Sequence, residues 1–491
     1  MTSSLFKQKL TYKVMAMGVA LGICVSAQAT SLITTETLAD RGYAAAQLSL
    51  GIKYDVSGAS AQDIAKAVYW YTKAANQGNV SAQNNLAYMY ETGTGVEQDS
   101  VKAMYWYKKS AQQGNALAQK NLGTLYATGR GVTADDNQAA LWYQRAAEQG
   151  EASAQYNIAI LYQQGRGVEQ DISKAVEWYQ KAAAQGDRRS QTRLGILYYN
   201  GLGVVRDYNK AYEWYRKAAA QEESSAQYNI GLMYDLGTGF QQDYAEAIKW
   251  YKKSAEQGYD SAQNNLGVMY EAGTGTQQNY AQALQWYKKA ADQGHANAQN
   301  NIGQLYQKGL GVTQDYKQAV YWMRKAAAQG NVLGQNNLGY MYERGFGVEQ
   351  DYAQSALWYK KAAEQGNAIG QGSLGWAYYS GLGVTQDYAQ ALSLLEQSAQ
   401  KGAAVGQNNL AIMYLEGNGV PQDYAKALEL LQKSAAQNYA NAQRNIGIMY
   451  VKGQKVAQDL EQAKRWFSQA CDNGSSSSCQ SYKALNGDKQ E

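Results

Sequence analysis

Apolar and polar positions along this chain repeat with a period of 36 residues. The stretch from Asn79 to Gly114, NVSAQNNLAYMYETGTGVEQDSVKAMYWYKKSAQQG, is representative, and copies of it follow one another without insertion from Tyr43 to Gly474. Periods of this length are typical of chains that stack one supersecondary unit many times. The residues at repeat position 1 of the twelve copies are Tyr43, Asn79, Asn115, Glu151, Asp187, Glu223, Tyr259, His295, Asn331, Asn367, Ala403 and Tyr439.

The first half of each copy has the apolar periodicity of a helix. Positions 4, 5, 8, 9 and 12 are the most uniform, and at about 100° per residue they lie on one side of a helix. Position 4 is always Ala, Ser or Gly, position 8 is Leu or Ile, and position 12 is Tyr in every copy. Small residues among large ones predict a helix that packs closely against its neighbours.

The second half predicts another helix after a tight turn. Ten copies carry Gly-x-Gly, as at Gly93 and Gly95, and glycine tolerates the positive φ of such turns. Position 21 follows with Asp in eleven copies and Asn279 in the other, which predicts a side-chain N-cap for the second helix. Trp and Tyr then recur on its apolar face, as at Trp106 and Tyr107. Each copy is therefore expected to form a helical hairpin with an aromatic seam.

One hairpin cannot bury this seam alone, so consecutive hairpins must stack. The fold class predicted is all-α, an α-solenoid of about twelve hairpins. The consensus AQxxLGxxYxxGxGVxxDxxxAxxWYxKAAxQG resembles the Sel-one-like repeat, a short relative of the tetratricopeptide repeat. The resemblance covers nearly the whole chain after its N-terminal segment. It implies a right-handed solenoid that serves as an interaction scaffold, often exported or membrane-associated, with no shared catalytic residue.

The ends of the chain differ from the repeats. Residues 1–29 place three lysines before an apolar run from Val14 to Val25 and end in Ala27-Gln28-Ala29, which predicts a cleaved signal peptide. The apolar run is too short to span a bilayer; a lipoprotein box at Cys24 is the alternative, although Ile23 is larger than such boxes allow. We expect a capping helix in residues 30–42, repeats in 43–474, and a capping helix with a tail in 475–491.

Charge and chemistry restrict the function classes. Without residues 1–29 the chain has 42 basic residues (45 minus 3) against 41 acidic ones, and nucleic-acid binding usually requires a basic excess. His295 is the single histidine, so histidine triads and histidine-rich metal sites are excluded. Ser398-x-x-Lys401 matches a β-lactamase motif, but it lies near a helix end and lacks the companion motifs. We therefore expect no enzyme, no cofactor, no metal and no nucleic acid.

Two polar positions repeat along the first helices. Gln occupies position 5 in all twelve copies and Asn occupies position 7 in nine. The amides either satisfy backbone groups at adjoining turns or bind the backbone of a peptide. We favour the structural interpretation, with Asn the better candidate for partner contact.

The remaining variable positions predict where a partner binds. Positions 3, 6, 10 and 13 lie opposite the uniform face, and first helices line the concave side in tetratricopeptide-like solenoids. Large aromatic residues without a packing role are typical of interface hot spots. The richest neighbourhood spans two copies and contains Asn336, Tyr340, Glu343, Trp376 and Tyr379.

The function predicted is that of a periplasmic or secreted scaffold that binds a partner protein in its groove, without stable insertion into a membrane. A cell-envelope glycan is the alternative ligand, because exposed Tyr and Trp also stack on sugar rings, and a β-lactamase-like hydrolase is a distant third. Cys471 and Cys479 resemble the helix-linking cysteines of the family's cysteine-rich branch. Both fall on packing faces of adjacent helices, so a disulfide is expected, as an exported chain allows.

Overall fold

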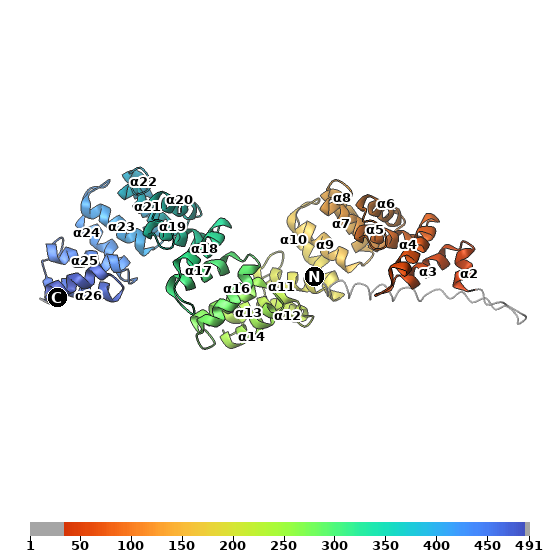
Figure 1. The fold of residues 1–491 in the computed structure, drawn as a ribbon, viewed down its shortest axis with the longest axis horizontal. Helices are drawn as coiled ribbons and strands as arrows, with labels where there is room; N and C mark the ends of the chain where they lie inside the picture. Colours follow the sequence, from red (N-terminus) through yellow and green to blue (C-terminus); the bar gives the residue numbers. More distant parts are fainter. Residues whose placement is uncertain (1–33, 487–491) are drawn as a thin grey trace, which may run out of the picture. The chain divides into compact units, whose positions relative to one another are not determined.

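The structure is a computed structural model that describes residues 34–486. In this range it contains 26 helices and no strand, which confirms the all-α prediction. The predicted signal peptide, residues 1–29, lies outside the described residues. The chain forms two compact units with the boundary after Ile230, and in each unit consecutive helices pair as hairpins (Figure 1).

Each repeat supplies one first helix and one second helix. The first helices are α3 (Ala44–Tyr54), α5 (Val80–Thr92), α7 (Ala116–Thr128), α9 (Ala152–Gln164), α11 (Arg188–Asn200), α13 (Ser224–Leu236), α15 (Asp260–Ala272), α17 (Ala296–Lys308), α19 (Val332–Arg344), α21 (Ala368–Ser380), α23 (Ala404–Glu416) and α25 (Ala440–Lys452). The second helices are α4 (Ala61–Asn76), α6 (Ser100–Gln112), α8 (Asp136–Glu148), α10 (Ile172–Ala184), α12 (Tyr208–Ala219), α14 (Tyr244–Glu256), α16 (Tyr280–Asp292), α18 (Tyr316–Ala328), α20 (Tyr352–Glu364), α22 (Tyr388–Gln400), α24 (Tyr424–Ala435) and α26 (Leu460–Asp472).

The second helices begin where the capping residues predict, with one exception. The Oδ1 atom of Asp315, for example, accepts from the backbone N–H of Gln318 at 3.0 Å. In the first copy the expected cap, Asp63, is instead inside α4, and Ser60 caps that helix three residues earlier. The prediction for this copy is wrong because its turn lacks Gly-x-Gly, and the Ser60 hydroxyl both accepts from the Asp63 backbone N–H and donates to the Asp63 carboxylate.

In nine of the twelve hairpins the core is the aromatic residue at position 29, on the second helix, and Met323, Leu395 and Leu431 take its place in the others. Tyr107 and Tyr287, for example, are fully buried. Position 9 of the first helix is small because this ring lies on it: a Cβ added to Gly267 would come within 2.6 Å of the Tyr287 ring. The aromatic seam predicted from the sequence is therefore the packing surface inside each hairpin.

Three pairs of consecutive first helices approach each other closely, α3 with α5, α17 with α19 and α21 with α23, whereas no pair of consecutive second helices among the described residues does so to the same extent. Side-chain hydrogen bonds join consecutive first helices, such as Asn337 Nδ2 to Asn300 Oδ1 at 2.9 Å. Helices α21 and α23 approach most closely, since a Cβ on Gly372 would lie 2.8 Å from Val405 and 3.0 Å from the Gly406 nitrogen. The first helices consequently line the inner side of the curve in each unit.

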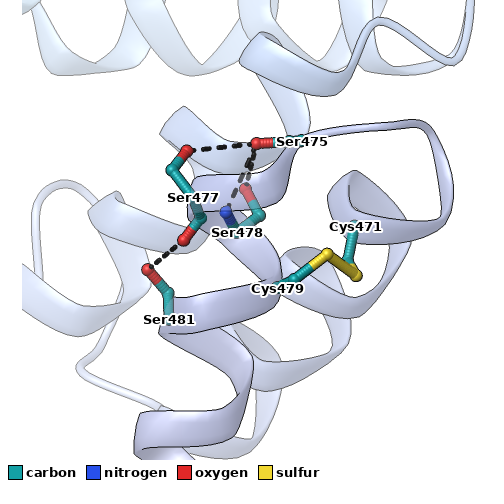
Figure 2. Close-up of a disulfide and its surroundings, with 6 residues drawn as sticks. All are labelled: Cys471, Ser475, Ser477, Ser478, Cys479 and Ser481. Atoms are coloured by element: carbon teal, nitrogen blue, oxygen red, sulfur yellow. Dashed lines mark hydrogen bonds between the residues drawn. A yellow bond between two sulfur atoms is a disulfide. The ribbon is translucent and has the colours of Figure 1, made fainter.

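A short helix stands at each end of the repeats. Helix α2 (Thr35–Asp40) packs on α3, and α27 (Ser476–Asn486) packs on α26. Cys471 of α26 and Cys479 of α27 form a disulfide, with their Cα atoms 4.7 Å apart (Figure 2). The bridge links the last helix to its main neighbour among the described helices.

Candidate functional site

The sequence-predicted binding residues lie on α19 and α21, but they differ widely in exposure. Tyr340 is 36% exposed, whereas Asn336 and Tyr379 retain only 6% and 7%. Glu343 and Trp376 are half-buried. The expectation that all five side chains face water is therefore wrong for Asn336 and Tyr379.

The burial follows from helical geometry. Positions 6 and 13 are turned by roughly 40° to 80° from positions 3 and 10 around the helix axis, toward the following copy. The next first helix covers that side: Asn336 donates to Asn367 Oδ1 at 2.6 Å, and the hydroxyl of Tyr379 donates to Glu416 of α23. The exposed strip of each first helix is thus centred on positions 3 and 10.

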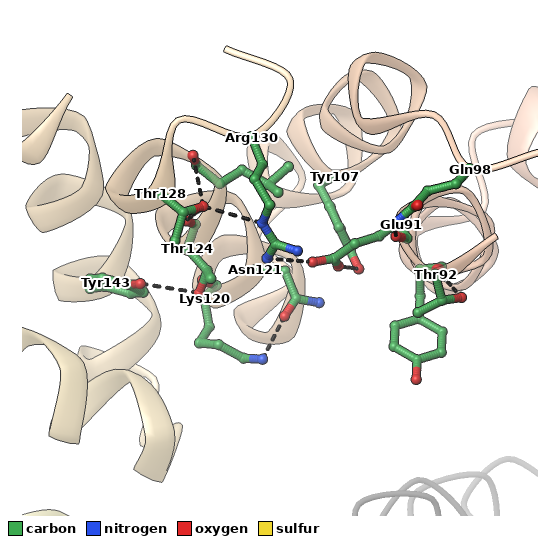
Figure 3. Close-up of polar contacts among 12 residues, drawn as sticks. Glu91, Thr92, Gln98, Tyr107, Lys120, Asn121, Thr124, Thr128, Arg130 and Tyr143 are labelled. Carbon is green, nitrogen blue, oxygen red and sulfur yellow. Dashed lines mark hydrogen bonds and ion pairs between the residues drawn. The ribbon is translucent and has the colours of Figure 1, made fainter. Parts of the chain in front are cut away.

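Position 13 has a packing role that the sequence pattern did not reveal. The hydroxyl of Tyr359, at position 29, donates to Glu343 at 2.8 Å, and the same pairing joins Tyr107 to Glu91 at 2.8 Å (Figure 3). Burial raises the pKa of the Tyr359 hydroxyl, and the charge of Glu343 raises it further. The prediction that position 13 varies for reasons other than packing is therefore wrong.

Tyr340 and Trp376 retain accessible surface but also contact neighbours. Arg344 lies over the Tyr340 ring at 5.7 Å, and Trp376 stacks on Tyr379 with ring centres 5.3 Å apart. Position 3 adds two apolar side chains that the sequence prediction did not name individually, Leu333 at 50% and Ile369 at 52% exposure. The sequence could have identified both residues, because position 3 is polar in most other copies, as at Ser153 and Asn297.

The inner side of this unit curls enough to bring distant copies together. Tyr439, the residue before α25, is affected electrostatically by Glu343, Arg344 and Tyr340, which belong to a copy about a hundred residues earlier. Burial is the main reason that the pKa of Tyr439 is raised.

The repeated glutamine is structural, as the favoured interpretation predicts. Gln299 donates to the Ala291 carbonyl at 3.3 Å and accepts from Gln329 at 2.8 Å, and most other copies repeat both bonds. The asparagine at position 7 is largely engaged as well, since Asn301 and Asn445 each donate to an asparagine of the preceding first helix. Asparagine is consequently not the free contact residue that was expected.

The candidate catalytic residues have ordinary structural partners. The Ser398 hydroxyl is buried and donates to the Ala368 carbonyl at 2.6 Å, while Lys401 donates to the Gly366 carbonyl at 2.7 Å. His295 caps α17, and burial lowers its pKa. Between residues 34 and 486, no group of three or more His, Cys, Asp or Glu side chains is arranged to hold a metal ion.

Stacked helical hairpins with an exposed inner strip define the class of the protein: a helical-repeat scaffold. The chain belongs to the Sel1 repeat family, which matches it in twelve segments, residues 44–79, 80–115, 116–151, 152–187, 188–222, 224–259, 260–295, 296–331, 332–367, 368–402, 404–439 and 440–475. Proteins of this family typically act as scaffolds for protein interactions. This confirms the resemblance seen in the sequence.

Two solved structures are similar to this chain. The c5321 protein, a protective antigen of uropathogenic Escherichia coli strains with an SLR fold, is 34% identical over 94% of this chain and 98% of its own, with a TM-score of 0.68. A Sel1 repeat protein from Oxalobacter formigenes is 33% identical over 65% of this chain and 91% of its own, with a TM-score of 0.47. No curated protein sequence matches the chain.

Proposed function

We propose that this protein is an exported scaffold that binds a partner protein on the inner side of its C-terminal unit, at α19 and α21. The observation that carries the proposal is the exposed apolar strip of Leu333, Tyr340 and Ile369 beside half-buried Trp376. Seven of the ten other copies fold with Ser, Asn or Arg at position 3, and two fold with Thr124 or Gln304 at position 10, so the fold tolerates polar residues at both positions. Exposed apolar patches of this kind mark interaction sites.

The structural contacts divide the five predicted residues by role. Tyr340 and Trp376 are proposed to touch the partner directly. Asn336, Glu343 and Tyr379 support them, since each is bonded to a neighbouring helix or to the hairpin core. Substituting the first pair should therefore change binding, and substituting the others should mainly change stability.

Affinity capture from a cell-envelope extract tests the proposal. The variant L333S/Y340S/I369S should lose at least about tenfold of the captured partner while its melting temperature stays within a few degrees, because hot spots carry most of the binding energy. Y88S is the matched control, since Tyr88 occupies position 10 of another copy and has the same 36% exposure as Tyr340. Equal loss in both variants, or undiminished capture by the triple variant, would contradict the proposed site.

The same extract separates the competing ligands. Capture that disappears after muramidase digestion would favour an envelope glycan, and hydrolysis of a chromogenic β-lactam would favour an enzyme. Export is tested by N-terminal sequencing of the protein from the envelope. We expect Thr30 as the first residue, and none of the described helices could cross a bilayer. Recovery of residues 1–29 or of a lipid-modified Cys24 would contradict a cleaved, unanchored chain.

A further inference from the structure

A second surface lies on the second helices of the N-terminal unit. Four large apolar side chains are exposed there on three consecutive second helices: Tyr69 of α4 at 52%, Val101 and Tyr105 of α6 at 66% and 50%, and Leu141 of α8 at 41%. Tyr69, Tyr105 and Leu141 all occupy repeat position 27, so the three side chains leave their hairpins in equivalent directions. These four residues are called the outer patch below.

The scaffold does not require apolar residues in the outer patch. The next two helices of the same unit, α10 and α12, carry Glu177 and Glu213 at position 27. Their hairpins keep a buried tyrosine at position 29, Tyr179 and Tyr215, and α10 spans the same repeat positions as α6 and α8. The apolar side chains of α4, α6 and α8 therefore expose a surface that water disfavours without a gain in packing.

Cations surround the outer patch. Lys109 lies 4.7 Å from the centre of the Tyr105 ring, and Lys73 lies 5.5 Å from that of Tyr69. Helix α6 contains no acidic residue, and the single acid of α4, Asp63, is half-buried and paired with Lys66. Helix α8 has two acids, Asp136, which pairs with Arg166, and Glu148 in its last turn. Within the described part of the chain, no carboxylate forms an ion pair with Lys73, Lys108 or Lys109.

We propose that the outer patch docks the protein on the surface of an anionic lipid bilayer. Exposed Tyr, Val and Leu suit the boundary between headgroups and acyl chains, and lysines beside them attract anionic headgroups. The abundance of lysine argues against a protein partner, because lysine is depleted from protein interfaces. A glycan is disfavoured because Lys73 and Lys109 already lie over the aromatic faces on which a sugar ring would stack.

Vesicle binding tests the proposal. The purified full chain is mixed with vesicles of equal parts phosphatidylglycerol and phosphatidylcholine, or of phosphatidylcholine alone, and the bound fraction is measured by flotation. We expect binding to the anionic vesicles only, and weaker binding as salt rises. The variant K73Q/K108Q/K109Q should lose at least about tenfold in apparent affinity, since each cation near an anionic surface contributes severalfold.

Two further variants exclude simpler explanations. Y69E/Y105E introduces at position 27 the glutamate that α10 and α12 carry as Glu177 and Glu213. This variant should therefore keep the melting temperature of the parent and lose as much vesicle affinity as K73Q/K108Q/K109Q. K181Q/R216Q/K217Q removes the same charge from the outer faces of α10 and α12 and should change affinity less than about twofold. The proposal would be overturned if the two triple variants lost the same affinity or if the chain did not bind anionic vesicles. It would also be overturned if the chain bound soluble polygalacturonate or an acidic protein more strongly than it bound the vesicles.

Discussion

At the residue scale, hydrogen-bonding partners explain much of the variation between copies. Where position 29 is Tyr, position 13 is usually an acceptor, as in the pairs Tyr287–Glu271 and Tyr251–Asp235. Where position 29 is apolar, as at Leu431 or Phe467, position 13 carries no acid. The two positions are far apart in the repeat, so this dependence becomes visible only when both helices are in place.

A break in the asparagine ladder gives a test at this scale. Asn336 Oδ1 is buried without a hydrogen-bond partner, because the next copy has Ser373 where other copies have a donating asparagine. S373N should supply that donor and raise the free energy of unfolding by about 1 kcal/mol. Chemical denaturation measures the change. N337S removes an existing donor and should have the opposite sign; a shift in the same direction for both would show that the ladder is not the cause.

The buried tyrosines predict loss of stability in alkali. Burial, assisted by its hydrogen bond to Glu416, raises the pKa of Tyr379 to about 12, whereas an unfolded tyrosine titrates near about 10. The folded state favours the protonated hydroxyl, so this contribution is complete below pH of about 10 and is lost as the pH rises toward about 12. The melting temperature should fall less steeply across this range in Y379F than in the parent. Identical slopes would exclude a contribution from Tyr379.

At the element scale, interior helices have neighbours on both sides, whereas terminal helices depend on special contacts. Among the described helices α27 packs mainly on α26, and it has one buried residue, Ser478. The disulfide therefore contributes a larger share of the stability of α27 than a similar disulfide would contribute to a helix in the middle of the array. Terminal elements of repeat proteins are generally the first to open.

Removal of the disulfide tests this dependence. C471A/C479A should lower the free energy of unfolding by about 2 to 3 kcal/mol, as expected for a short cross-linked loop. Hydrogen exchange should increase in α27 and much less in α19. Thiol titration of the denatured parent protein should find no free thiol at Cys471 or Cys479. If α27 stays protected from hydrogen exchange in C471A/C479A, the role given to the disulfide is contradicted.

At the scale of the whole molecule, constant repeat length makes each copy a replaceable unit. The N–H of His295 bonds back to Ala290, and the same bond joins Tyr259 to Ser254 one copy earlier. Stability in such arrays is approximately a sum of repeat and nearest-neighbour terms. No single copy should therefore be essential for folding.

Deletion of one copy tests this expectation. Removing Tyr259–Gly294 joins Gly258 directly to His295 and restores the same junction, so helical content per residue should be unchanged in circular dichroism. Removing only α15 and its turn leaves α16 without its hairpin partner and exposes Tyr287, and should cause loss of cooperative unfolding. An unfolded product from the whole-copy deletion would show that distant copies depend on one another.

The sequence by itself determined the repeat length, the helix boundaries, most N-caps and the aromatic seam, because these depend on the period of one helix and on residues a few positions apart. The same reasoning predicted that the Gln at position 5 is structural. It also selected α19 and α21, where Tyr340 and Trp376 retain accessible surface.

Only the tertiary structure decided which part of each first helix stays exposed. Asn336 and Tyr379 are covered by the following copy. These features depend on how far each hairpin rotates against the next, which is set by the side chains packed between them, such as the absence of a side chain at Gly372. Small rotations between neighbouring hairpins add up over several copies. The residue pattern of a single helix does not predict this total rotation.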